Sequence, residues 1–169
     1  MQRLRLRYLD PIDTLQMNSS YRGEGFSIVA IQVTLIEFLA ATVAGMSYRH
    51  RKKGDPALTT YEYDRSAALF IDFLSSVPPF STEFTKTTAD EFYVNIRCGL
   101  LHEARTKQGW SVWAESHAGQ MVDPNRKIVF RNNLQSGLLA FLDIYRKRIV
   151  REKNLQVALV RKIDSLCME

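Results

Sequence analysis

The chain has 169 residues, of which 46% are hydrophobic and 24% are charged. This balance argues against disorder and predicts one globular domain over residues 1–169. The net charge of +5 favours an acidic partner, nucleic acid before a membrane, because basic charge strengthens binding to phosphates. Cys98 and Cys167 belong to no CxxC pair, which excludes a disulfide framework or a zinc ribbon and favours a reducing compartment.

The amino-terminal part of the chain predicts an irregular arm followed by a long helix. Residues 1–24 include Asp10-Pro11 and a polar stretch, and they contain no continuous apolar run of the kind found in a signal peptide, so we expect a cytoplasmic protein. Residues 25–48 are apolar on nearly every face of a helix. Because polar residues such as Glu37 interrupt this run, we expect a buried central helix and no membrane span.

Three further helices and a hairpin complete the predicted fold. A helix over residues 64–76 is ended by Val77-Pro78-Pro79, and a third helix begins near residues 87–90 and reaches about Lys107. Residues 110–130 contain two short alternating runs, which predict a β-hairpin. Asn132 or Asn133 caps a final helix to about Cys167, which is either one helix or two with a bend. The expected fold is an all-α, up-and-down helical bundle with this hairpin between its third and last long helices.

The third helix, within the stretch FYVNIRCGLLHEARTKQGW, carries an unusual number of polar residues. At 100° per residue five of them share one stripe: Glu91, Asn95, Cys98, His102 and Arg105. Arg97 lies about 140° from His102 on an ideal helix. Either a long Arg97 side chain that reaches around a groove or a two-fold contact between subunits could bring the pair into one cleft.

The segment RCGLLH resembles the Rx4-6H motif of HEPN domains, whose catalytic members are metal-independent endoribonucleases. The wider stretch, with YRGEGF and the apolar helix upstream, is also similar to bacterial HEPN families tied to plasmids and mobile elements. The resemblance covers the chain from about Tyr21 to the last helix. It implies a homodimer whose two motif helices face a common cleft, with Arg97 and His102 at the catalytic positions and no metal or other cofactor.

Two positions depart from the pattern of that superfamily. The residue after the motif arginine is often asparagine, and here it is Cys98. The tyrosine that HEPN toxins commonly carry two residues after the histidine is replaced by Ala104. Control by modification of that tyrosine, which a nucleotidyltransferase antitoxin performs, is therefore not expected.

The chemistry of the two motif residues agrees with RNA cleavage. The 2′-hydroxyl of RNA can attack the adjacent phosphorus if one group moves a proton and another stabilises the developing negative charge. His102 suits the first task and Arg97 suits the second. Asn95 could orient a phosphate or the histidine, and Glu103 could hold His102 or Arg97. Glu37, on the apolar helix, needs a partner, and Arg97 is a candidate.

Other interpretations of these residues remain open. The basic residues Arg51, Lys52, Lys53 and Arg105 could contact RNA or form a solvated surface. Cys98 and His102 could form a nucleophile pair or two metal ligands, but no third group supports either site.

The sequence therefore predicts an endoribonuclease that acts as a toxin or a phage-defence effector, with an antitoxin or defence protein as a possible partner. Two alternatives have no enzymatic activity. The chain could be a HEPN module that binds RNA or nucleotide, or a partner subunit in a dimer. A purely structural helical protein is a third possibility.

Overall fold

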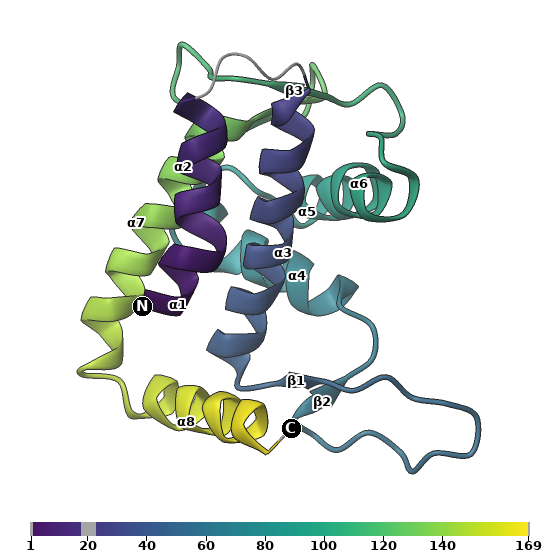
Figure 1. Ribbon diagram of the computed structural model, residues 1–169, viewed down its shortest axis with the longest axis vertical. Helices are drawn as coiled ribbons and strands as arrows, with labels where there is room; N and C mark the ends of the chain where they lie inside the picture. The colour runs from purple at the N-terminus through teal and green to yellow at the C-terminus, as the bar shows by residue number, and fades with distance from the viewer. Residues whose placement is uncertain (1, 18–22, 169) are drawn as a thin grey trace.

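A long apolar helix, α3 (Glu24–Ala44), runs through the middle of the molecule in the computed structural model (Figure 1), which describes residues 2–17 and 23–168. α3 ends four residues before the predicted position, because Gly45 adopts a left-handed conformation with φ of 64°. Its N–H bonds to the carbonyls of Ala41 and Thr42 and closes the last turn. The prediction of a predominantly helical protein is confirmed.

α3 behaves as a core helix in this fold. By length and composition alone it could cross a membrane, but 56% of its most apolar window is buried inside the structure. Side chains on several of its faces, including Val29, Leu35 and Ala41, are fully enclosed by other parts of the protein. A core helix of a soluble protein meets the same criteria of length and composition.

Residues 2–17 form helical turns, so the prediction of an irregular arm over residues 1–24 is wrong for this part; residues 18–22 lie outside the described chain. α1 (Gln2–Leu4), the π-turn η1 (Arg5–Leu9) and α2 (Asp10–Met17) follow one another without a break. The π-turn helps the helix to accommodate Pro11. The N–H of Asp10 binds the carbonyl of Arg5, so the backbone hydrogen-bond pattern is already shifted by one residue where proline has no N–H to donate.

A two-stranded element that the sequence analysis did not predict follows α3. β1 (Ser47–Tyr48) and β2 (Glu62–Tyr63) pair in parallel, with Tyr48 opposite Tyr63. α4 (Ala67–Ser76) therefore begins three residues later than predicted, because the preceding residues lead out of β2.

The predicted third helix has two α-helical parts and a π-turn between them. α5 (Lys86–Phe92) follows the 3-10 turn η2 (Phe80–Thr82) and is capped by Thr85, whose hydroxyl accepts the N–H of Thr88 at 3.1 Å. The π-turn η3 (Tyr93–Arg97) leads into α6 (Cys98–Glu103). The helix ends four residues before Lys107, because Ala104 takes a left-handed φ of 54°.

A three-stranded sheet replaces the predicted hairpin over residues 110–130. β3 (Ser111–Trp113), β5 (Ile128–Phe130) and β4 (Val122–Asp123) lie in that order. β4 and β5 are antiparallel, as in a hairpin, but β3 pairs with β5 in parallel. The two predicted runs do pair, as β3 and β5, but the predicted antiparallel orientation is wrong and β4 was not predicted. β5 is central, and its three residues are all buried.

The predicted last helix is two helices, the second of the two alternatives left open by the sequence. α7 (Arg131–Ile149) and α8 (Lys153–Cys167) are separated by a turn. Arg148 and Glu152 form an ion pair across this turn, with 2.6 Å between Nε and Oε1. α8 then crosses the lower end of α3 (Figure 1).

Candidate active site

The motif helix changes its winding at the residues that carry the motif. The N–H of Cys98 binds the carbonyl of Tyr93, five residues earlier, which makes η3 a π-turn ending at Arg97. Turns of this kind occur often at functional sites. His102 follows in α6 and is exposed to solvent.

Arg97 and His102 meet within a single chain. Nη1 of Arg97 lies 3.5 Å from Nε2 of His102. The first of the two geometries considered from the sequence, a long arginine reaching around the helix, is therefore sufficient to bring the pair together. A subunit interface is not needed for this contact.

Glu37 holds the other side of the Arg97 guanidinium. Its Oε2 accepts hydrogen bonds from Nη2 at 2.7 Å and from Nε at 3.2 Å, so the predicted Glu37–Arg97 pair is confirmed. Both side chains are mostly buried, at 16% and 20% exposure. Burial alone would lower the pKa of Arg97, but the hydrogen bond and the charge of Glu37 outweigh it and raise that pKa.

Two tyrosines that the sequence analysis missed surround this ion pair. The guanidinium of Arg97 lies 5.3 Å from the ring centre of Tyr93, and the hydroxyl of Tyr93 is 3.1 Å from that of Ser66. Tyr63 is buried, and burial followed by the negative charge of Glu37 raises the pKa of Tyr63 to about 12. No spacing signal in the sequence points to them, because β2 and η3 meet only through the fold.

A tight loop after α6 shapes the lower edge of the site. The N–H of Lys107 binds the carbonyl of Asn95 at 3.0 Å, and a β-carbon on Gly99 would overlap the carbonyl oxygen of Arg105. The side chain of Asn95 is 8% exposed and makes no hydrogen bond with any residue in the described ranges. Its amide thus keeps its donors and acceptor available, which is compatible with the predicted supporting role.

Glu103 has other partners than those predicted for it. Its carboxylate binds Arg105, with 2.9 Å to Nη2, and Lys107, with 2.6 Å to Nζ. The hydrogen bonds from Lys107 and Arg105 lower the pKa of Glu103. Glu37, and not Glu103, is the carboxylate that holds Arg97.

The four basic residues proposed to contact RNA differ in whether an acidic side chain already pairs with them. Arg51 lies 3.6 Å from a carboxylate oxygen of Asp64, and Arg105 is paired with Glu103. Lys52 and Lys53 are exposed, and neither ammonium group forms an ion pair with a residue in the part of the chain that the structure describes. Of these four residues, Lys52 and Lys53 are the two whose charge is fully available to a ligand.

Within residues 2–17 and 23–168, no group of three or more His, Cys, Asp and Glu side chains is placed to hold a metal ion. Cys98 is a free, half-buried thiol.

Comparison of the chain with protein-family models, with curated proteins and with solved structures found no match. The assignment of this site therefore depends on its own residues and geometry.

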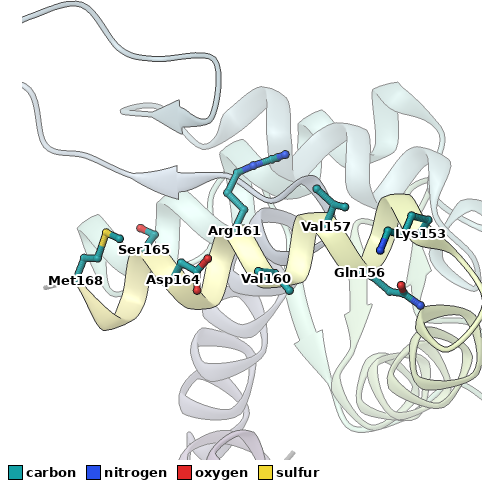
Figure 2. Close-up of a pocket in the computed structure, with 8 residues that line it drawn as sticks. All are labelled: Lys153, Gln156, Val157, Val160, Arg161, Asp164, Ser165 and Met168. Carbon is teal, nitrogen blue, oxygen red and sulfur yellow. The ribbon is translucent and has the colours of Figure 1, made fainter.

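A groove of about 700 Å³ lies elsewhere, along α8 (Figure 2). Its lining includes Val157, Val160, Arg161 and Met168. None of its lining residues belongs to the motif helix or to α3, so it is separate from the Arg97–His102 site.

Proposed function

We propose that this protein is a HEPN-type endoribonuclease that cleaves RNA without a metal ion. One observation carries the proposal: Arg97 directs Nη1 to His102 while Glu37 occupies Nε and Nη2. A guanidinium held in this way is preorganised, so its charge is already in place when a phosphate binds.

In the proposed reaction, the RNA supplies its own nucleophile. The 2′-hydroxyl attacks the adjacent phosphorus, and the bond to the 5′-oxygen of the next nucleotide breaks. His102 moves the proton, as a base toward the 2′-hydroxyl or as an acid toward the leaving oxygen, because an imidazole exchanges protons near neutral pH. Arg97 stabilises the charge on the non-bridging oxygens. The products carry a 2′,3′-cyclic phosphate and a 5′-hydroxyl.

The surface beside the motif suits a two-fold interface. Val94 and Leu101 are 44% and 43% exposed and lie on the motif helix on either side of Arg97 in sequence. Exposed apolar side chains next to the motif are surface that a second copy of the helix can cover. In such a homodimer the two Arg97–His102 pairs share one cleft.

The proposed biological role follows from the same resemblance. A ribonuclease that acts in the cytoplasm on cellular or phage RNA would serve as a toxin or a defence effector, held in check by an antitoxin or another protein. The net charge of +5 supports attraction to RNA.

A second candidate is an RNA-binding HEPN module without catalysis. The observation in its favour is Cys98, which stands directly after Arg97 where a polar asparagine is frequent in the superfamily. Such a module would bind RNA and leave it intact.

The test is incubation of labelled total RNA with the purified protein in excess EDTA, followed by analysis of the product ends. We expect the wild type to cleave and His102→Ala to lose about 10²–10⁴-fold in rate. Arg97→Ala should lose about 10²–10³-fold. His117→Ala, which removes another exposed histidine, should keep full activity.

Circular dichroism must show that each variant is folded, since Arg97→Ala leaves Glu37 without its partner. Intact RNA after incubation with folded wild type would overturn the ribonuclease and move the assignment to the binding module.

A further inference from the structure

Tyr48 presents an exposed aromatic ring on β1, where it packs against Tyr63, a neighbour of the Glu37–Arg97 pair. Its side chain is 52% exposed, whereas Tyr63 opposite it on β2 is 9% exposed. The two rings meet edge to face, with centroids 5.7 Å apart and an angle of 68°. The backbone around Tyr48 is held on both sides, because Ser47 and Arg49 each donate their N–H to a carbonyl of the β2 segment at 2.9 Å.

Tyr48 is connected with Arg97 partly by side-chain contacts and partly along the backbone. Tyr63 packs against the Tyr48 ring, and the same segment of chain reaches Ser66 three residues later. The Ser66 hydroxyl is 3.1 Å from that of Tyr93, and the Tyr93 ring lies under the guanidinium of Arg97. The charges of Glu37 and Arg97 both act on the pKa of Tyr63, which agrees with this proximity.

The loop that leaves Tyr48 carries free cations. Arg49 is fixed within the loop, with 3.1 Å to Glu62 and with hydrogen bonds to the carbonyls of Pro56 and Ala57. Lys52 and Lys53 extend from the same loop into solvent, and their ammonium groups have no ion-pair partner among the residues that the structure describes. An exposed aromatic ring and unpaired cations on the same segment of chain are the side-chain types that bind single-stranded nucleic acid.

We propose that Tyr48 is a stacking platform for one base of a single-stranded RNA whose cleaved phosphate lies at Arg97 and His102, and that Lys52 and Lys53 contact neighbouring phosphates. The inference rests on the proposed ribonuclease function and adds a base-binding subsite to it. Every base has a π-face, so the platform tolerates different bases. Because Tyr63 supports the ring from the protein side, little side-chain entropy is lost when a base stacks on it.

The test measures binding without cleavage. Fluorescence anisotropy follows a short, fluorescein-labelled 2′-O-methyl RNA, which lacks the attacking hydroxyl, as the protein is added. We expect Tyr48→Ala to raise the Kd by about 5- to 150-fold, and Tyr48→Phe, which keeps the ring, to stay within about twofold of wild type. Tyr48→Leu keeps apolar packing against Tyr63 but has no π-face, so it should bind as weakly as Tyr48→Ala.

Tyr61 provides a matched control. It is 47% exposed, but the guanidinium of Arg161 already covers its ring at 3.4 Å. Tyr61→Ala should therefore leave the Kd unchanged. The double variant Lys52→Gln, Lys53→Gln should reduce the slope of log Kd against log salt by about 1.4, since each phosphate contact to a single strand contributes about 0.7.

Binding by folded Tyr48→Ala as tight as that of wild type would overturn the inference, and so would wild type that does not bind the RNA. Loss of binding in Tyr48→Phe equal to that in Tyr48→Ala would also overturn it, because the hydroxyl and not the ring would then carry the contact. Cleavage of unmodified RNA by the same wild-type sample tests the ribonuclease separately. Tyr48-dependent binding without cleavage supports the subsite and rejects the enzyme.

Discussion

The Arg97 side chain divides its nitrogens between two partners. Glu37 binds Nε and Nη2, and Nη1 faces His102. A planar guanidinium can do this because its donors have fixed directions, which a lysine ammonium does not offer. The same ion pair places a negative charge near the buried ring of Tyr63, which makes this tyrosine a reporter on the site.

Tyr63 gives a prediction for alkaline pH. Burial and the charge of Glu37 raise the pKa of Tyr63 from 10.0 to about 12. Because the folded protein keeps this proton to higher pH than the unfolded chain does, the contribution to stability is full below about pH 10 and is lost as the pH rises through about 12. We expect the free energy of unfolding to fall by roughly 2 kcal/mol more in wild type than in Tyr63→Phe over this range.

Urea denaturation at a series of pH values measures this difference, and Tyr63→Phe should remove one late ionisation from the tyrosinate absorbance. Burial also raises the pKa of Tyr145, so the late ionisation of Tyr145 should remain. Tyr61→Phe, at an exposed position, should leave the late step in place. An unchanged titration curve in Tyr63→Phe would contradict the assignment.

At the level of elements, the end of α3 lies closely against α8. A β-carbon on Gly45 would come within 2.8 Å of Cα of Ala158 and 2.9 Å of Nη1 of Arg161. Gly45 also has φ of 64°, a left-handed conformation that is unfavourable for a residue with a β-carbon. The crossing of α8 over α3 in Figure 1 thus depends on the absence of a β-carbon at Gly45 as well as on the turn that Gly45 forms.

Gly45→Ala should accordingly destabilise the protein by about 2–5 kcal/mol, the sum of left-handed strain and overpacking. Gly54 offers the matched control, since its φ is 98° but nothing lies within 4 Å of an added β-carbon. Gly54→Ala should cost about 1 kcal/mol. Urea denaturation measures both variants, and equal losses would show that α8 does not approach Gly45 as closely as described.

For the whole molecule, the exposed apolar side chains on the motif helix are the feature most relevant to assembly. Val94 and Leu101 remain 44% and 43% exposed in the single chain, although they belong to the same helix as the polar motif residues. A two-fold contact through this face would bury them and place two active sites together.

If the proposed homodimer forms through this face, Leu101→Lys should weaken it by about tenfold or more, because a charge would be buried in the interface. Leu139→Lys is the control, since Leu139 is 47% exposed on α7 and is remote from the motif in sequence. Sedimentation equilibrium over a concentration series measures both. A wild type that stays monomeric throughout, or two variants that dimerise equally, would reject this interface.

Local patterns in the sequence determined the helical content and most helix positions. Apolar residues on every face of residues 25–48 identify the central helix, and the break at Gly45 is local, because glycine can take the left-handed conformation that ends a helix. The motif residues Arg97 and His102, and the need of Glu37 for a partner, could also be inferred, because a carboxylate among apolar residues must be compensated.

Tertiary structure alone decided which of these residues meet. Residues 2–17 become helical where Leu9 and Ile12 find a core to enter, and β3 pairs with β5 in parallel although β4 is its nearer neighbour in sequence. The sequence pattern of two short strands does not determine their relative orientation, so an antiparallel hairpin was predicted for β3 and β5, and β4 was not predicted. Glu37 and Arg97 are 60 positions apart, and helical periodicity has no bearing on a contact between two helices. The Glu37–Arg97 contact, together with the π-turn that ends at Arg97, directs the Arg97 side chain toward His102.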